Sequence, residues 1–326
     1  MKKQVVVTLK CDEQQKEAIS KELTDLADIT YLEELEEADR AQVLKSSDVL
    51  LSMIFPLEVK SEEYEILKNV SLLQEVAAGV DFLPFADLRD GITICSNAGA
   101  WADPMAEHIL GMVLTLGKNL LTNHARLARG EFERQAPSKR FRGATCGIVG
   151  FGGIGKATAA LMRLLGMKIF AMNSSGRTDE PVDFIGTLKD MEKVFKACDV
   201  VIISLPLKKQ ARHIIGPTQL AWMKEDAILI NAARAEIIEE KALYEHMKKH
   251  PDFKVGLDVW WMEPRSHGEF SVNYPFFELQ NLLGSPHNSP VVGGAFPEAL
   301  KFASENVRLF LTGQELRGFV DRSDYI

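Results

Sequence analysis

The fold is decided by one stretch, Thr145 to Met162, which reads TCGIVGFGGIGKATAALM. A short apolar strand opens it, and helix-like residues follow from Lys156. Between them the spacing G-x-G-x-x-G is typical of loops that bind a dinucleotide, because the helix start turns free N–H groups and a positive dipole toward the pyrophosphate. The sequence therefore predicts a dinucleotide-binding loop made of Gly150, Phe151, Gly152, Gly153, Ile154 and Gly155.

Apolar runs separated by mostly helical patterns continue from this loop toward the C-terminus. They are Cys146 to Val149, Lys168 to Met172, Val200 to Leu205, Ile228 to Ile230, Val255 to Val259 and Leu282 to Gly284. Near-continuous apolar strands with such crossovers predict a buried parallel sheet. Ligands of these sheets lie beyond the carboxyl ends of the strands. The candidate site residues are those that follow the strands: the glycine loop, Asn173, Pro206, Arg234, Asp258, Glu263 and His287.

The chain on either side of this region also shows α/β alternation. Strands are expected at Val5 to Leu9, Val49 to Ile54, Leu72 to Ala77 and Ile92 to Cys95, and helices at Asp12 to Ala27 and Ser61 to Leu67. One long helix is predicted from Pro104 to Arg129, and a last helix from Pro297 to Leu311 that returns to the first domain. With 326 residues, the chain is expected to form two α/β domains.

Composition excludes several classes of protein. The formal net charge of −8 makes nucleic acid an unexpected partner. No targeting segment or membrane-spanning run is visible, so a cytoplasmic protein is expected. The four cysteines are far apart and lack metal-ligand spacing, which predicts no metal site and mostly buried, structural thiols.

The residues after the second strand of the series bear on the choice of cofactor. NAD enzymes usually carry an acidic residue there, which accepts hydrogen bonds from the ribose. Here the position is Asn173, followed by Ser174 and Ser175, and Arg177 lies close by. Hydroxyl and amide groups with a guanidinium suit a phosphate, so the sequence favours NADP(H) over NAD(H).

Arg234, Glu263 and His287 together fit the reduction of a 2-oxo acid. Histidine transfers protons near neutral pH, and a carboxylate beside it orients the ring and favours its charged form. Arginine binds a carboxylate with two hydrogen bonds and polarises a carbonyl. Each residue alone is weak support, since all three types are common in loops. Their shared place after parallel strands predicts one site.

At this point the chain resembles the D-isomer-specific 2-hydroxyacid dehydrogenase family, from about Ala77 to Pro290. The matching segments are Ala78-Gly79-Val80-Asp81, Asn97-Ala98-Gly99, Met105-Ala106-Glu107, the glycine loop, Asn231-Ala232-Ala233-Arg234, Asp258-Val259, Glu263-Pro264 and Pro286-His287. The resemblance implies two Rossmann-like lobes, with a dinucleotide-binding domain at residues 99–290. That domain would be inserted in a smaller flavodoxin-like substrate-binding domain at residues 1–98 and 291–326. It also implies a homodimer formed through the cofactor domains.

The resemblance further implies roles for single residues. His287 would exchange the proton, with Glu263 as its partner, and Arg234 would orient the substrate. The backbone of Ala78, Gly79 and Val80 would receive the substrate carboxylate. Asn97 would line the site, and Asp258 would hold the nicotinamide carboxamide.

The leading interpretation is an oxidoreductase that prefers NADPH and reduces a small 2-oxo acid such as glyoxylate or hydroxypyruvate. Two alternatives stay open: an NAD-dependent D-lactate or other D-2-hydroxyacid dehydrogenase, and a non-catalytic nucleotide-sensing protein on the same fold. Retention of Arg234, Glu263 and His287 favours an enzyme. Trp260 and Trp261 depart from the family pattern, and they either shape the substrate pocket or pack at a domain interface.

Overall fold

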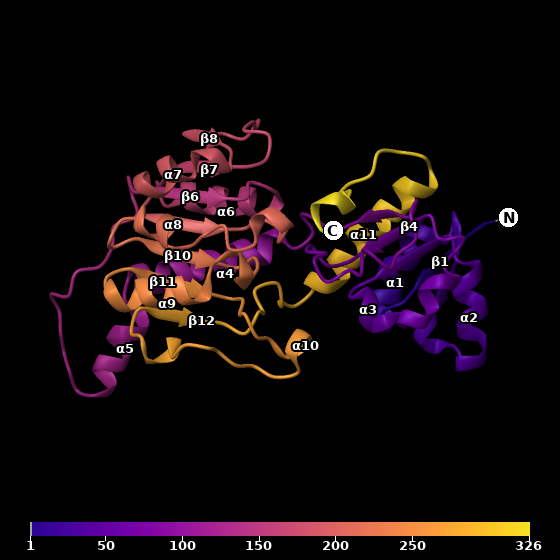
Figure 1. Ribbon diagram of the computed structural model, residues 1–326, viewed down its shortest axis with the longest axis horizontal. Helices are drawn as coiled ribbons and strands as arrows, with labels where there is room; N and C mark the ends of the chain where they lie inside the picture. Colours follow the sequence, from indigo (N-terminus) through magenta and orange to yellow (C-terminus); the bar gives the residue numbers. More distant parts are fainter. Residues whose placement is uncertain (1) are drawn as a thin grey trace. The chain divides into compact units, whose positions relative to one another are not determined.

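The computed structural model describes residues 2–326, and the chain forms two compact units (Figure 1). The first unit consists of Met1–Trp101 and Val291–Ile326, and the second of Ala102–Pro290. The chain of the second unit is thus inserted between the two segments of the first. Each unit is built on its own parallel sheet.

The second unit contains a seven-stranded sheet in the order β12-β11-β10-β9-β6-β7-β8, and every neighbouring pair is parallel. Its strands are β6 (Thr145–Val149), β7 (Lys168–Met172), β8 (Phe184–Gly186), β9 (Val200–Ile203), β10 (Ile228–Asn231), β11 (Lys254–Leu257) and β12 (Leu282–Gly284). The order is that of a doubly wound dinucleotide-binding fold. All six predicted strands are present. Strand β8 was not predicted, because three residues at a sheet edge leave no periodic pattern to recognise.

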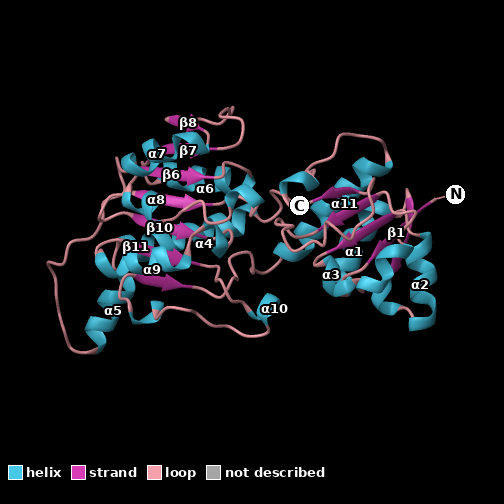
Figure 2. Ribbon diagram, viewed as in Figure 1, coloured by secondary structure: helices cyan, strands magenta, loops and turns pink. Residues whose placement is uncertain are grey.

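Helices cover both faces of this sheet (Figure 2). The helices are α4 (Ala102–Gly117), α6 (Gly153–Leu164), α7 (Met191–Ala197), α8 (Pro217–Ala221) and α9 (Glu240–Lys249). Residues of α4 and α6 share one buried core with Cys146 and Ile148, whereas those of α7, α8 and α9 share another with Val149. Because successive strand residues point to opposite faces, a continuous apolar strand supplies both cores.

The prediction of one helix from Pro104 to Arg129 is wrong. Helix α4 ends at Gly117, and α5 (Leu120–Ala128) begins after Asn119, whose backbone φ of 55° is left-handed. The Nζ atom of Lys254 donates to the carbonyl of Leu116 at 3.0 Å and also contacts the Asn119 amide oxygen. These contacts come from a strand remote in sequence, so the helical pattern alone could not reveal the break.

The first unit contains a five-stranded parallel sheet in the flavodoxin-like order β2-β1-β3-β4-β5. Its elements are β1 (Lys3–Val7), α1 (Glu13–Leu23), β2 (Ala27–Tyr31), α2 (Glu37–Ser46), β3 (Val49–Ser52), α3 (Phe55–Glu58), β4 (Leu72–Glu75), β5 (Thr93–Cys95) and α11 (Ala295–Leu311). The expected helix from Asp12 to Ala27 is shorter than predicted. Asp12 caps its start, and Ala27 already belongs to a strand.

The C-terminal segment packs on the N-terminal one. Helix α11 lies against α1, and the Arg308 guanidinium donates to both carboxylate oxygens of Asp25, each at 2.8 Å. The last helix therefore belongs to the first unit. The segment expected to be helical at Ser61 to Leu67 is a 3-10 helix, Ser61–Ile66.

Three of the four cysteines are buried within the units, and the structure has no disulfide among residues 2–326. Burial raises the pKa of Cys95 to about 11 and that of Cys198 to about 12. The prediction of buried structural thiols is confirmed for Cys95, Cys146 and Cys198. Along the same residues, no helix combines the length and apolar character needed to cross a membrane.

Glu75, the last residue of β4, is fully buried, and within residues 2–326 neither carboxyl oxygen has a hydrogen-bond partner. Burial raises the pKa of Glu75 well above its ordinary value, and the charge of Glu58 adds to the increase. The folded protein therefore keeps a proton that the unfolded chain releases near pH 4.5, and stability is lost as pH rises above that value.

The substitution Glu75→Gln should stabilise the protein at pH 8 and much less at pH 5. Each unit of pKa difference corresponds to about 1.4 kcal/mol of unfolding free energy, and glutamine cannot ionise. Urea unfolding at the two pH values measures the effect, with the exposed Glu62→Gln as the matched control. Equal gains at pH 5 and pH 8 would show that Glu75 does not hold an extra proton in the folded state.

Candidate active site

The predicted cofactor loop joins β6 to α6, beside the point where the strand order of the larger sheet reverses. Strand β6 lies between β7 and β9. After β6 the chain adds strands β7 and β8 on one side of it, and then strands β9 to β12 on the other side. Such a switch point opens a crevice at the carboxyl ends of the strands. Pro206 follows β9 in this region, and Asn173 follows β7.

Two glycines of the loop, Gly150 and Gly155, are required by close backbone contacts. Gly150 has a φ of 102°, and a Cβ added to it would lie 2.5 Å from the backbone N of Leu205. A Cβ on Gly155 would lie 2.3 Å from the carbonyl oxygen of Gly150. A Cβ on Gly152, at the start of α6, would meet no atom within 4 Å. Open space over a helix start suits a pyrophosphate, so these residues fit a dinucleotide.

Ser204 closes the same loop from the neighbouring strand. Its hydroxyl donates to the carbonyl oxygen of Gly150 at 2.7 Å. The N–H groups of Gly150 and Phe151 both donate to the carbonyl of Met172, at 3.0 and 2.9 Å. The loop is thus attached to both strands that flank β6.

The segment after β7 folds into a compact turn around Asn173. Its side-chain oxygen accepts from the N–H of Gly176 at 2.7 Å, and its side-chain nitrogen donates to the carbonyl of Arg177 at 2.8 Å. The amide of Asn173 therefore shapes the turn. The side chains of Ser174, Ser175 and Arg177 are exposed at its surface.

His287 and Glu263 form a hydrogen-bonded pair. The His287 Nδ1 atom lies 2.7 Å from Glu263 Oε2, and the other carboxylate oxygen accepts from the N–H of Trp260 at 2.8 Å. Burial alone would raise the pKa of Glu263. The hydrogen bonds from His287 and Trp260, with the positive charge of Arg234, outweigh burial and lower the pKa below its ordinary value. Glu263 thus stays ionised beside the imidazole.

Arg234 follows β10 in a turn organised by Asn231. The side-chain nitrogen of this fully buried asparagine donates to the carbonyl of Arg234 at 2.9 Å, and its oxygen accepts from the N–H of Ala233 at 3.1 Å. The positive charge of Arg234 is one of the influences that lower the pKa of Glu263, the hydrogen-bond partner of His287. That these three residues form one catalytic site stays a prediction.

Asp258 is fully buried, and its carboxylate faces the turn that carries His287. It accepts from the N–H of Asn288 and the N–H of Ser289, each at 3.1 Å. Contact with a nicotinamide carboxamide therefore stays a prediction for this residue. The hydrogen bonds that Asp258 accepts stabilise the turn that carries His287.

The expected substrate residues of the first unit lie together at the end of β4. Asn97 donates from its backbone N–H to the carbonyl of Ala77 and from its side chain to Ala299, both at 2.9 Å. Within residues 2–326, the N–H groups of Ala78, Gly79 and Val80 donate to no backbone carbonyl. Three such donors in one loop suit a carboxylate. The amide oxygen of Asn97 is buried there and has no partner among the same residues.

The two adjacent tryptophans pack within the second unit. The Trp260 indole stacks on Phe277 and donates to the carbonyl of Ser285 at 2.8 Å. The Trp261 indole stacks on Phe276 and donates to the carbonyl of Ile238 at 3.0 Å. Both side chains thus have a structural role inside this unit. The contact between Trp260 and Ser285 also ties Trp260 to the loop before His287.

Sequence reasoning missed His108 and Ser285. The His108 Nε2 atom lies 3.0 Å from the Ser285 hydroxyl and 3.7 Å from Asp258 Oδ1. A signal was available in the helix period, because His108 precedes the buried Met112 by four residues and so shares its sheet-facing side. A histidine on such a face is a candidate partner for a strand end.

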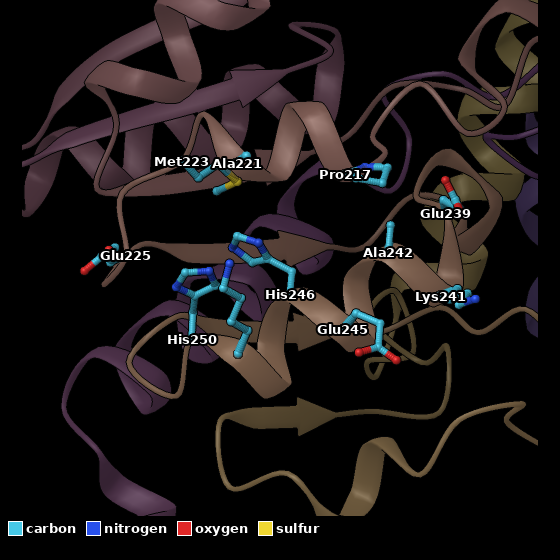
Figure 3. A pocket seen from close by; sticks show the side chains of 11 residues that line it. Pro217, Ala221, Met223, Glu225, Glu239, Lys241, Ala242, Glu245, His246 and His250 are labelled. Atoms are coloured by element: carbon cyan, nitrogen blue, oxygen red, sulfur yellow. The ribbon is translucent and has the colours of Figure 1, made fainter.

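A hollow of about 640 Å³ lies elsewhere on the second unit, between α8 and α9 (Figure 3). His246 and His250 lie side by side in it, with ring centroids 4.5 Å apart. Burial, with the charges of His250 and Lys249, lowers the pKa of His246 to about 4, and its ring packs edge-on against Phe253. None of the predicted site residues lines this hollow. Across residues 2–326, no group of three or more potential ligands is arranged to hold a metal ion.

Comparison with known proteins agrees with this geometry. Residues 110–289 match the family model described as D-isomer specific 2-hydroxyacid dehydrogenase, NAD binding domain. Hydroxypyruvate reductase from Thermotoga maritima is 30% identical over 270 residues, which cover 82% of this chain and 84% of the relative. Glyoxylate reductase from Thermococcus kodakarensis is 26% identical over 280 residues, 83% of this chain and 82% of the relative.

A solved structure shares the fold. The D-isomer specific 2-hydroxyacid dehydrogenase family protein from Aeromonas salmonicida matches with a TM-score of 0.81 and 23% identity. The match covers 99% of this chain and 100% of that one. The two-lobe α/β architecture expected from the sequence is therefore confirmed.

Proposed function

The chain belongs to the D-isomer specific 2-hydroxyacid dehydrogenase family, and from this premise we propose that it reduces a small 2-oxo acid with NADPH. The observation that carries the proposal is the 2.7 Å contact between His287 and Glu263 beside Arg234, at the end of the sheet that bears the glycine loop. The names of two relatives, hydroxypyruvate reductase and glyoxylate reductase, support substrates of this size.

The residues of the chain fit the proton and charge changes of this reaction. A bound NADPH supplies a hydride for the carbonyl carbon. The His287 imidazolium gives its proton to the carbonyl oxygen, which yields the 2-hydroxy acid, and the Glu263 carboxylate stabilises the imidazolium beforehand. Arg234 binds the substrate carboxylate and polarises the carbonyl. In the first unit, the N–H groups of residues 78–80 form a second set of donors suited to a carboxylate.

A steady-state panel tests the function. Glyoxylate, hydroxypyruvate and pyruvate are each offered with NADPH and with NADH, and nucleotide oxidation is followed by absorbance. We expect turnover of glyoxylate or hydroxypyruvate with a higher kcat/KM for NADPH. Binding of nucleotide without turnover of any 2-oxo acid would instead support a nucleotide-sensing protein.

The cofactor preference makes its own prediction. A hydrogen bond to a charged group contributes about 1.5–3 kcal/mol, so Arg177→Ala should raise the KM for NADPH about ten- to a hundred-fold and change that for NADH little. Asn173→Asp keeps an oxygen for the Gly176 N–H and adds a negative charge, which should favour NADH. Initial-rate kinetics with both nucleotides measure these shifts.

The exposed Arg134→Ala is the matched control for Arg177 and should change neither KM. Equal losses for NADPH and NADH in Arg177→Ala would contradict a phosphate contact. A wild-type kcat/KM that is higher with NADH would contradict the preference itself.

We also propose that the chain forms a homodimer through α5 and the residues after it. Helix α5 has no buried residue, and it exposes Leu120, Leu121 and Leu127, each by more than half, while Phe132 is 78% exposed. Large apolar side chains that stay exposed within one short segment are typical of an interface between subunits.

The double substitution Leu120→Asp with Leu127→Asp should convert this dimer into single chains of 36.3 kDa. Charges placed in an apolar interface lose hydration without gaining a partner. Light scattering after gel filtration measures the mass. Leu57→Asp, at a leucine that is 70% exposed in the first unit, is the control and should stay dimeric. A wild-type protein that is monomeric at micromolar concentration would refute the dimer.

A further inference from the structure

The turn that carries His287 has a strained backbone, and hydrogen bonds to one carboxylate, that of Asp258, hold it in place. His287 has a backbone φ of 53°, a left-handed conformation that a residue with a side chain rarely adopts. Residues keep such conformations only where their surroundings over-determine them, at a cost of about 1–3 kcal/mol. In this turn the restraint comes from the buried carboxylate of Asp258.

Asp258 accepts hydrogen bonds from residues on both sides of His287. Before it, the Ser285 hydroxyl donates to Oδ1 at 2.6 Å. After it, the N–H of Asn288 donates to Oδ1 and that of Ser289 to Oδ2, each at 3.1 Å. Three donors from five consecutive residues on one carboxylate close the turn, so its shape depends on where that carboxylate lies.

The direction of the hydrogen bond between Ser285 and His108 follows from the single proton of the Ser285 hydroxyl. Ser285 has a single hydroxyl proton, and the short contact with Asp258 uses it. The 3.0 Å contact between Ser285 Oγ and His108 Nε2 therefore needs the proton of the imidazole N–H. A chain of donors runs from His108 through Ser285 to Asp258.

His108 also lies close to Asp258 itself. Its Nε2 atom is 3.7 Å from Oδ1 of this fully buried carboxylate. A buried carboxylate without hydrogen bonds and a partner is costly, so it would move toward water if these were removed. Helix α4 supplies this partner from outside the strands that bear the site residues.

We propose that His108 is a positioning residue, which acts through Ser285 and Asp258 to hold the turn that presents His287 for proton transfer. The catalytic part of this inference rests on the proposed function. The structural part does not, because the state of the turn can be measured without substrate. A displacement of about 1 Å in a reacting group can cost about a hundred-fold in rate.

Hydrogen exchange of the free protein tests the structural part. Pro286 and Pro290 have no amide hydrogen, so a peptide over residues 285–290 reports on few amides, including those of Asn288 and Ser289. We expect His108→Leu to speed exchange of these two amides about ten-fold or more, which corresponds to losing one net hydrogen bond of about 1.4 kcal/mol. His108→Gln can still donate to Ser285 and should exchange within about three-fold of the wild type.

Kinetics test the catalytic part. His108→Leu should lower kcat about ten- to a hundred-fold and leave the KM for NADPH nearly unchanged, with His108→Gln restoring most of kcat. Ser285→Ala should reproduce the loss, and Ser285→Thr, which keeps a hydroxyl, should not. These serine variants keep the test valid if His108→Leu is too unstable to assay.

The outcomes separate the two claims. Unchanged exchange of residues 285–290 in both His108→Leu and Ser285→Ala would overturn the positioning role. Equal loss in His108→Leu and His108→Gln would also overturn it, because a hydrogen bond would then not be what matters. A wild-type protein that reduces no 2-oxo acid would overturn the proposed function and leave the exchange result to stand.

Discussion

His287→Asn should lower kcat for reduction of the preferred 2-oxo acid about 100- to 10,000-fold, the contribution usual for a positioned acid–base group. The asparagine side-chain nitrogen can still donate to Glu263, so the pair keeps its hydrogen bond and loses the proton that is transferred. The KM for NADPH should change little, because the glycine loop lies on a different strand. Initial rates and nucleotide binding by fluorescence measure the two effects.

His267→Asn is the matched control. His267 is an exposed histidine four residues after Glu263, with its ring nitrogen 2.9 Å from the Ser266 hydroxyl. This variant should keep wild-type kcat. A fall of less than about ten-fold in His287→Asn, with chemistry limiting the rate, would mean that another group supplies the proton.

The same assignment gives a pH dependence. Reduction adds a proton to the carbonyl oxygen, so kcat/KM should fall as pH rises. Glu263→Gln removes the carboxylate that lies 2.7 Å from His287 Nδ1 and should lower kcat at every pH. A profile that is flat through neutral and mildly alkaline pH would exclude His287 as the acid.

Arg234→Lys should lower kcat/KM about 100- to 1,000-fold, the range found when a donor that stabilises developing charge is removed. Lysine keeps the positive charge but presents a point charge in place of two parallel donors. If bidentate binding of the substrate carboxylate matters, Arg234→Lys and Arg234→Gln should be impaired to a similar order. Nucleotide binding should be unchanged in both.

Arg212→Lys is the matched control for Arg234→Lys. Arg212 is exposed in the segment after β9, and its substitution should leave kcat/KM within about two-fold, as is usual for surface changes. If Arg234→Lys kept wild-type kcat/KM, the site would need only a positive charge, and the two-point contact with substrate would be wrong.

The glycine loop was predictable because all its determinants are contiguous. The strand, the turn and the helix start occupy one short segment, and the backbone contacts of Gly150 and Gly155 are those that the spacing implies. The loop could be predicted without knowing the order or register of the strands. The failure at Asn119 has the opposite cause, since a lysine more than a hundred residues away contacts the break in the helix.

The residues of the candidate active site were predictable as types and as strand ends. Arg234, Glu263 and His287 each follow a parallel strand, which places them at one edge of a sheet. That His287 and Glu263 come within 2.7 Å, and that the pKa of Glu263 is lowered, depend on how the loops fold back over the strands. Sequence spacing does not reveal whether burial or hydrogen bonding has the larger effect on the pKa of Glu263.

The sequence by itself determined the parallel α/β architecture and the dinucleotide loop, and it named the candidate acid–base residues, because these depend on local periodicity and on chain order. Only the tertiary structure decided that Asn173 folds its own turn, that Trp260 packs inside the unit, and that His108 supports the His287 turn from α4. The physical reason is distance along the chain. Hydrogen bonds and burial between remote segments follow from packing, which no local pattern specifies.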